Sequence, residues 1–241
     1  MSPRGFVKSA LTLGVGYTAV AGLFWALLSV PESNVLALTS SLALVVALVA
    51  AAGVTTGGAA AFGHDAAARE AARRSMAGLP GFVAGLLVFA ALWWLTAGAD
   101  TWWRAHRGEA DALWLRYVGS SRTGPLHALV EWTLWLARWV LGPSIVAGLV
   151  SVGTLGGVRS TVKGLRTAFG LAPLAVAAAG ALVISQGLQR LAYWRPKMLP
   201  PNWLEPTFAA VKLFAIYASL AVIGAAVLGV HGRAARNRGI T

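Results

Sequence analysis

The chain has 241 residues, of which 57% are hydrophobic and only 12% are charged, and its mean hydropathy is +0.68. Because a soluble domain carries about 25% charged residues, this composition excludes an ordinary soluble globular protein. The sequence contains no cysteine, so disulfides, thiolate metal sites and cysteine nucleophiles are also excluded.

Long apolar segments without charged residues recur along the chain. A membrane-spanning helix needs about 20 apolar residues, and six segments reach this length. We therefore predict an all-α, polytopic integral membrane protein with six transmembrane helices in a single domain, residues 1–241, and interfacial helical segments in the outer loop. The predicted spans are about residues 9–31, 34–62, 78–99, 129–157, 167–189 and 209–230.

The first apolar segment follows two basic residues, Arg4 and Lys8, as a secretory signal peptide would. Its apolar run is longer than the roughly 7–15 residues of a usual signal-peptide core, and further spans follow it. We interpret it as a retained first helix.

The connection at residues 64–78 is rich in alanine and carries Arg73 and Arg74. Alanine favours helix, and arginine side chains interact with phospholipid headgroups. The sequence predicts a short cytoplasmic helical turn. A docking site for a cytoplasmic partner is the alternative.

The net charge of +12 lies mostly in the connections between apolar segments, where it favours lipid headgroups over nucleic acid as the partner. Eleven basic residues fall on one side of the predicted membrane and seven on the other. Because basic loops stay in the cytoplasm, we expect both termini to be cytoplasmic. The first side holds Arg4, Lys8, Arg69, Arg73, Arg74, Arg159, Lys163, Arg166, Arg233, Arg236 and Arg238.

The largest outer connection, residues 100–125, mixes tryptophan and tyrosine with arginine. An aromatic and basic mixture outside the apolar core is typical of a helix that lies in the membrane interface. We expect such a helix over residues 109–118. A lid, or a docking surface for another subunit, is the alternative.

Three polar residues follow one face of the helix that begins the fourth span: His127, Glu131 and Arg138. Their spacings of four and seven residues place them on the same side. Ionisable residues at membrane depth indicate function, whereas the tryptophans beside them favour a position in the headgroup region. Gly142-Pro143 then predicts a kink or break.

The connection at residues 190–206 contains four prolines and several aromatic residues, which indicate a fixed shape at headgroup level. It is either an interfacial connector or a partner-binding or gating loop. The candidate interface residues are Tyr193, Trp194, Arg195 and Trp203.

Polar residues near the outer ends of the predicted spans suggest a polar vestibule. Gln186 lies toward the end of the fifth span, and Lys212 lies about one turn into the sixth. The candidate vestibule residues are Glu131, Arg138, Gln186 and Lys212.

Recognisable catalytic chemistry is missing from the sequence. The four histidines fall at span ends or in loops, which argues against a haem pair. The eight carboxylates are scattered, and neither a metalloprotease motif nor a nucleophile elbow nor a phosphate-binding loop occurs. We therefore predict no catalytic, cofactor-binding or metal-ligating residue, no cofactor and no nucleic-acid partner.

These patterns favour a non-catalytic integral membrane subunit or scaffold of a larger bacterial envelope complex, located in the inner (cytoplasmic) membrane. Its partners would be membrane lipids and other membrane-protein subunits. A permease-type protein that moves a lipid or other apolar solute is the alternative. A third possibility is an enzyme that acts on a lipid-linked substrate through Glu131, Arg138 and Lys212.

Overall fold

A computed structural model describes residues 1–30, 35–194 and 204–239. It is 91% helical, and the described residues contain no strand, which confirms the predicted all-α class. The α-helices are α1 (Pro3–Leu28), α2 (Val35–Gly63), α3 (Ala68–Ala105), α4 (Arg107–Val118), α5 (Gly124–Leu136), α6 (Gly142–Gly156), α7 (Gly164–Ala168), α8 (Leu171–Leu182), α9 (Gln189–Tyr193) and α10 (Leu204–Asn237).

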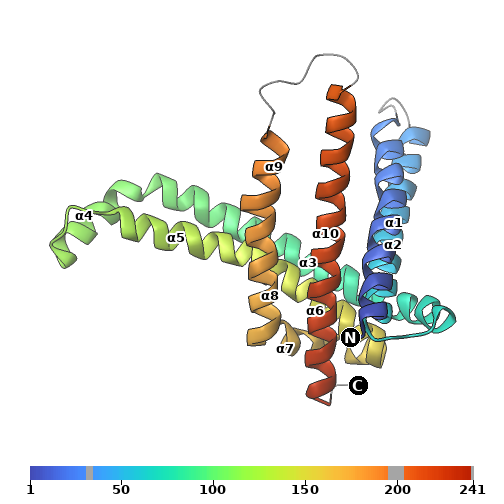
Figure 1. The fold of residues 1–241 in the computed structure, drawn as a ribbon. Coiled ribbons are helices and arrows are strands. Elements are labelled where there is room, and N and C mark those ends of the chain that lie inside the picture. Colours follow the sequence, from blue (N-terminus) through green and yellow to red (C-terminus); the bar gives the residue numbers. More distant parts are fainter. Residues whose placement is uncertain (31–34, 195–203, 240–241) are drawn as a thin grey trace.

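Six helical stretches of the described chain are long and apolar enough to cross a membrane, which confirms the predicted multi-pass architecture. They are Pro3–Leu28, Ala37–Gly63, Ala68–Ala105, Gly124–Gly156, Leu171–Tyr193 and Pro206–Asn237. The two chain ends lie at the same end of the molecule (Figure 1).

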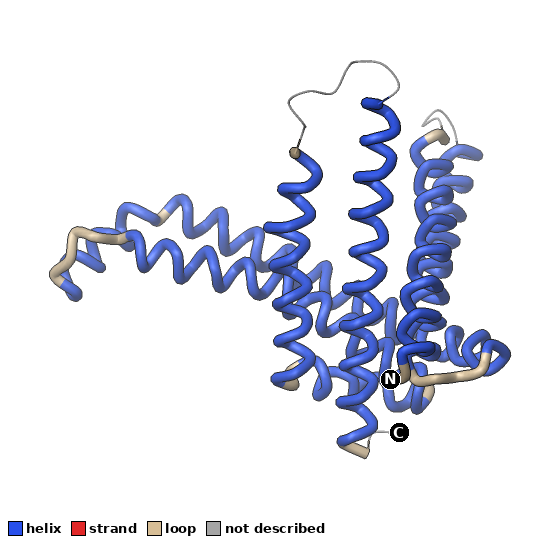
Figure 2. Tube along the Cα trace, in the orientation of Figure 1, coloured by secondary structure: helices blue, strands red, loops and turns tan. Residues whose placement is uncertain are grey.

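The helices form two units that cross (Figure 1). Helices α1, α2 and α10 and the α8–α9 stretch run side by side as a bundle. Helix α3 packs closely against α6 and continues beside α5. Together, α3 and the stretch from α5 to α6 form a hairpin that crosses the lower part of the bundle and projects from it. Figure 2 shows α4 and the loop after it at the tip of this hairpin.

The hairpin contains two of the predicted connecting elements. The short helical turn predicted at residues 64–78 is instead the first part of α3, which continues for 38 residues because its alanine-rich start favours helix. The helix predicted over residues 109–118 is present as α4.

Glycines let backbones touch where the two units cross and within the hairpin itself. A β-carbon on Gly57 of α2, in the bundle, would lie 2.5 Å from the carbonyl oxygen of Ser75 in α3. Within the hairpin, a β-carbon on Gly81 of α3 would lie 2.6 Å from the carbonyl oxygen of Leu149 in α6. Only a residue without a side chain lets the backbones approach this closely. Beside these contacts, a buried core combines small residues such as Ala59 and Val150 with the larger Phe82 and Leu228.

Two helical stretches contain a π-helical segment, in which hydrogen bonds join residues five apart. Segment η1 (Ala137–Leu141) joins α5 to α6, and η3 (Val183–Leu188) joins α8 to α9. Gly142-Pro143, where the sequence predicts a kink or break, directly follows η1. The helical stretch continues through this point, and the N–H of Gly142 donates to the carbonyl of Ala137, five residues before it. Segments of this kind are rare and occur frequently at functional sites.

Candidate functional site

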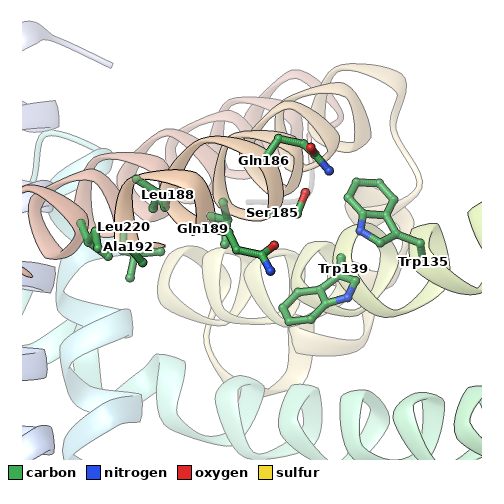
Figure 3. Close-up of a pocket in the computed structure, with 10 residues that line it drawn as sticks. Trp135, Trp139, Ser185, Gln186, Leu188, Gln189, Ala192 and Leu220 are labelled. Atoms are coloured by element: carbon green, nitrogen blue, oxygen red, sulfur yellow. The ribbon is translucent and has the colours of Figure 1, made fainter. Parts of the chain in front are cut away.

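A cavity of about 580 Å³ lies beside both π-helical segments, at the junction of the hairpin and the bundle. This volume falls within the roughly 300–1,000 Å³ typical of small-molecule sites. Figure 3 shows the cavity between the tryptophans of the hairpin and the polar residues of the η3–α9 stretch. It is lined by Trp135, Trp139, Ile184, Ser185, Gln186, Leu188, Gln189, Ala192, Ile216 and Leu220.

The two tryptophans of the cavity are each held by a second tryptophan. Trp135 packs edge to face against Trp132, with ring centroids 5.4 Å apart. Trp139 packs in the same way against Trp93 of α3, at 5.6 Å. Such contacts favour one ring orientation, so the aromatic wall is fixed from outside the cavity.

Arg138 supports this wall indirectly. Its Nε donates to the hydroxyl of Thr96 at 2.9 Å, and a terminal nitrogen donates to the Thr96 carbonyl at 2.7 Å. Its guanidinium carbon lies 5.5 Å from the ring centre of Trp93, within cation–π range. Arg138 therefore faces α3 and positions Trp93, which in turn contacts Trp139.

The opposite wall is polar but uncharged. Ser185, Gln186 and Gln189 face the tryptophans across the cavity (Figure 3). The amides of Gln186 and Gln189 are exposed and have no hydrogen-bond partner among the residues that the structure describes. Both amides are therefore available to a ligand, each as a donor and an acceptor.

A second cavity of about 540 Å³ adjoins the first and shares Ile184 and Leu220 with it. Its few polar groups are mostly engaged: the Tyr17 and Thr56 hydroxyls are 3.0 Å apart, and the Tyr217 hydroxyl donates to the Gly14 carbonyl at 2.6 Å. The remaining walls are apolar, formed by Leu13, Phe82, Leu86, Phe89, Pro143, Val146, Ala147, Ile223, Gly224, Ala221, Val227 and Leu228.

The four predicted vestibule residues do not share one wall. Gln186 lines the first cavity. The Lys212 amine donates to the carbonyls of Ala192 (2.7 Å) and Trp194 (2.9 Å), and because Ala192 lines the cavity, Lys212 lies at its rim. Arg138 faces α3, and Glu131 is exposed without an ion pair among the described residues.

The residues of the predicted polar stripe, His127, Glu131 and Arg138, also have different surroundings. Nε2 of His127 lies 2.7 Å from the carboxylate of Asp111 in α4, and Nε of Arg107 donates to its Nδ1 at 3.1 Å. His127 therefore joins α5 to α4 at the hairpin tip, about three helical turns from Arg138.

The predicted interface residues are described only in part. Tyr193, which ends α9, is exposed, and the Trp194 ring lies 5.4 Å from that of Phe208 in α10. Arg195 and Trp203 lie outside the described residues.

His231 is a residue that the sequence analysis missed. We expected it at a span end, but α10 continues past it and it is completely buried. Its Nδ1 lies 2.8 Å from the Val227 carbonyl, and its Nε2 lies 2.9 Å from the Ser144 hydroxyl, which also reaches the Ala168 carbonyl. It joins α10 to α6.

The described residues contain no group of three potential metal ligands.

A polar cluster joins the connections at the basic end of the molecule. Arg236 of α10 donates to Nδ1 of His64 at 2.9 Å. Burial, followed by the positive charges of Arg236 and Arg74, lowers the pKa of His64 to about 4. Beside it, a hydrogen bond from the Ser2 hydroxyl lowers the pKa of Asp65. These contacts tie both chain ends to the connection between α2 and α3.

Comparison with known proteins gives no match to a protein-family model, a curated protein or a solved structure. The functional argument therefore depends on the site itself.

Proposed function

We propose that this membrane protein binds one lipid-like amphipathic molecule between its hairpin and its bundle and moves it as a permease. In this proposal the chain lies in a bacterial inner membrane with both termini in the cytoplasm, since the more basic end holds both termini.

The observation that supports this function is the pair of adjoining cavities. One cavity has tryptophan, serine and glutamine in its walls, whereas the other is almost wholly apolar, and Ile184 and Leu220 belong to both. A lipid has the same two parts, a polar headgroup and an apolar chain. Helix packing alone does not require two adjoining cavities, one with polar groups and one apolar.

The π-helical segments give this site a means to change. Trp139 belongs to η1, and Ser185 and Gln186 belong to η3. Conversion of a π-helical turn to an α-helical turn shifts the register of its side chains. Conversion of η1 would therefore alter the tryptophan wall of the first cavity, and conversion of η3 would alter the polar wall. Permeation needs such a change between two arrangements of one site.

A scaffold within a larger complex remains the second candidate, because the projecting hairpin exposes large aromatic side chains. Trp94, Trp102 and Trp132 are each more than half exposed. Lipid or the surface of another subunit would cover them.

The test is to close the junction between the two cavities. Ile184→Trp would fill the shared wall, and Leu182→Trp is the matched control because Leu182 lies on the same helical stretch, is 42% exposed and lines neither cavity. Purified protein would be assayed for lipid retained in mild detergent. It would also be reconstituted in phosphatidylcholine vesicles with tail-labelled fluorescent lipid to follow movement between leaflets.

We expect wild type and Leu182→Trp to retain and move lipid, and Ile184→Trp to lose at least tenfold in both measurements. Equal lipid retention and movement by all three proteins would contradict the proposal. Wild-type protein that moves no lipid alone, but is recovered with other subunits, would favour the scaffold.

A further inference from the structure

The residues that line the first cavity indicate the chemistry of the lipid headgroup that would bind there. Its ten described lining residues include no charged side chain. A phosphate or carboxylate buried there would lose hydration without gaining an opposite charge. The walls therefore favour an uncharged headgroup.

Two cations near this cavity, Lys212 and Arg138, are already engaged. The Lys212 amine donates to two carbonyls of the last turn around α9, at 2.7 and 2.9 Å. Arg138 donates twice to Thr96 and lies 3.9 Å from the carboxylate of Asp100. Either residue would have to give up its present partners in order to bind an anionic headgroup.

The uncharged polar groups indicate what kind of neutral headgroup fits. Gln186 and Gln189 offer amide oxygens as acceptors as well as amide donors, and the Ser185 hydroxyl can do both. A headgroup that only accepts hydrogen bonds, such as a quinone, would leave the amide oxygens without a donor. Hydroxyl groups satisfy donors and acceptors together.

The aromatic wall completes the match. Trp135 and Trp139 are held in fixed orientations by Trp132 and Trp93. The face of an indole ring is electron-rich, so it attracts the weakly positive C–H groups on the face of a sugar ring. Flat aromatic rings on one side and amides on the other are suited to a sugar, whose ring faces are apolar and whose edge carries hydroxyls.

We infer that the ligand is a glycolipid with an uncharged sugar headgroup, in which the sugar occupies the first cavity and the apolar chain occupies the second. This inference rests on the proposed function, because it assumes that the two cavities hold one lipid. It assigns sugar-binding roles to Trp135, Trp139, Gln186 and Gln189, and a positioning role to Arg138.

The experiment compares three lipids by native mass spectrometry of the full chain in detergent. The probes are a monoglucosyl diacylglycerol, a phosphatidylglycerol with the same acyl chains, and an isoprenoid quinone. The variants are the double substitution Gln186→Leu with Gln189→Leu, and Thr133→Val as a control, since Thr133 is exposed on the neighbouring helix and outside the cavity. Elution as a single species checks that each variant is folded.

We expect wild type and Thr133→Val to bind the glucosyl lipid at least tenfold more tightly than the other two probes. The double variant should lose this preference while it still binds phosphatidylglycerol as wild type does. A wild-type preference for phosphatidylglycerol or the quinone would overturn the sugar assignment and leave the lipid site standing. If Ile184→Trp bound all three lipids as wild type does, the site itself would be wrong.

Discussion

The foot of the molecule, where the hairpin crosses the bundle, and the outer half of the hairpin are both helical and apolar, but different contacts hold them together. At the foot, nearly every residue of α6 from Gly142 to Thr154 is buried, and backbones touch at Gly81 and Gly148. In the outer half, α4 and α5 contain no buried residue, and the helices are joined by the polar contacts of Arg138 and His127.

This difference explains where the cavities lie. Small residues let helices approach until no space remains between them, whereas tryptophan and arginine side chains keep them apart. The first cavity begins where Trp135 and Trp139 of the hairpin replace the small residues of α6. The foot is therefore closely packed, and the wider part beside it forms the site.

The largest expected loss of stability follows from the addition of one methyl group at Gly81, where α3 contacts α6. In Gly81→Ala the new β-carbon would lie 2.6 Å from the carbonyl oxygen of Leu149, and backbone on both sides cannot move away cheaply. We expect a loss of about 3 kcal/mol in unfolding free energy, measured by thermal or denaturant unfolding in detergent.

Gly98→Ala is the matched control for this change, because it lies on the same helix with nothing within 4 Å of the added β-carbon. It should be neutral or stabilising by up to about 1 kcal/mol, since alanine favours helix over glycine. Equal effects at the two positions would show that α3 and α6 are not in backbone contact.

Acidification should cause a smaller loss of stability, through His64 at the basic end of the molecule. The pKa of His64 is lowered to about 4 by burial and then by Arg236 and Arg74, so the folded protein holds this side chain neutral where the unfolded chain protonates it. Its contribution to stability is complete above about pH 6.5 and is lost as the pH falls toward 4.

After a discount for the partial exposure of the side chain, we expect this loss to be about 2 kcal/mol. The measurement is the unfolding free energy of wild type and His64→Gln between pH 7 and 4. The wild-type value should fall over this interval and the variant should fall less. Parallel pH profiles for the two proteins would assign the titration to another group.

The smallest effect should come from the outer half of the hairpin, where two arginines approach the same carboxylate. Arg138 also donates to Thr96 and is mostly covered. Among the described residues Arg104 pairs only with Asp100, at 2.7 Å, and it is 75% exposed. Arg138→Met should cost about 1.5 kcal/mol, and Arg104→Met should cost less than about 0.5 kcal/mol.

The Arg138→Met variant should also change the tryptophan near-ultraviolet circular dichroism, because Trp93 loses the group that positions it against Trp139. Identical spectra and stabilities for the two arginine variants would mean that Arg138 does not support the cavity wall.

The sequence was sufficient for the class, the six apolar helices and the α4 helix, because these depend on local composition and helix propensity. It also placed Gln186 among the candidate polar residues, and that residue lines the cavity. It did not indicate Trp139 or Gln189 as members of a site, or His231 as buried, because an apolar helix shows no contrast between the side that faces lipid and the side that faces protein.

What the amino-acid sequence determined by itself was the all-α membrane class and the six segments that are long and apolar enough to cross a membrane. The cost of leaving backbone polar groups unpaired in lipid makes long apolar segments helical wherever they occur. Only the tertiary structure decided that the hairpin crosses the bundle, that Arg138 faces Thr96 and not Glu131, and that two unlike cavities meet at Ile184. The crossing depends on which glycines let two backbones touch, as Gly57 of α2 does against Ser75 of α3, and the spacing of small residues along one helix does not identify their partners on another.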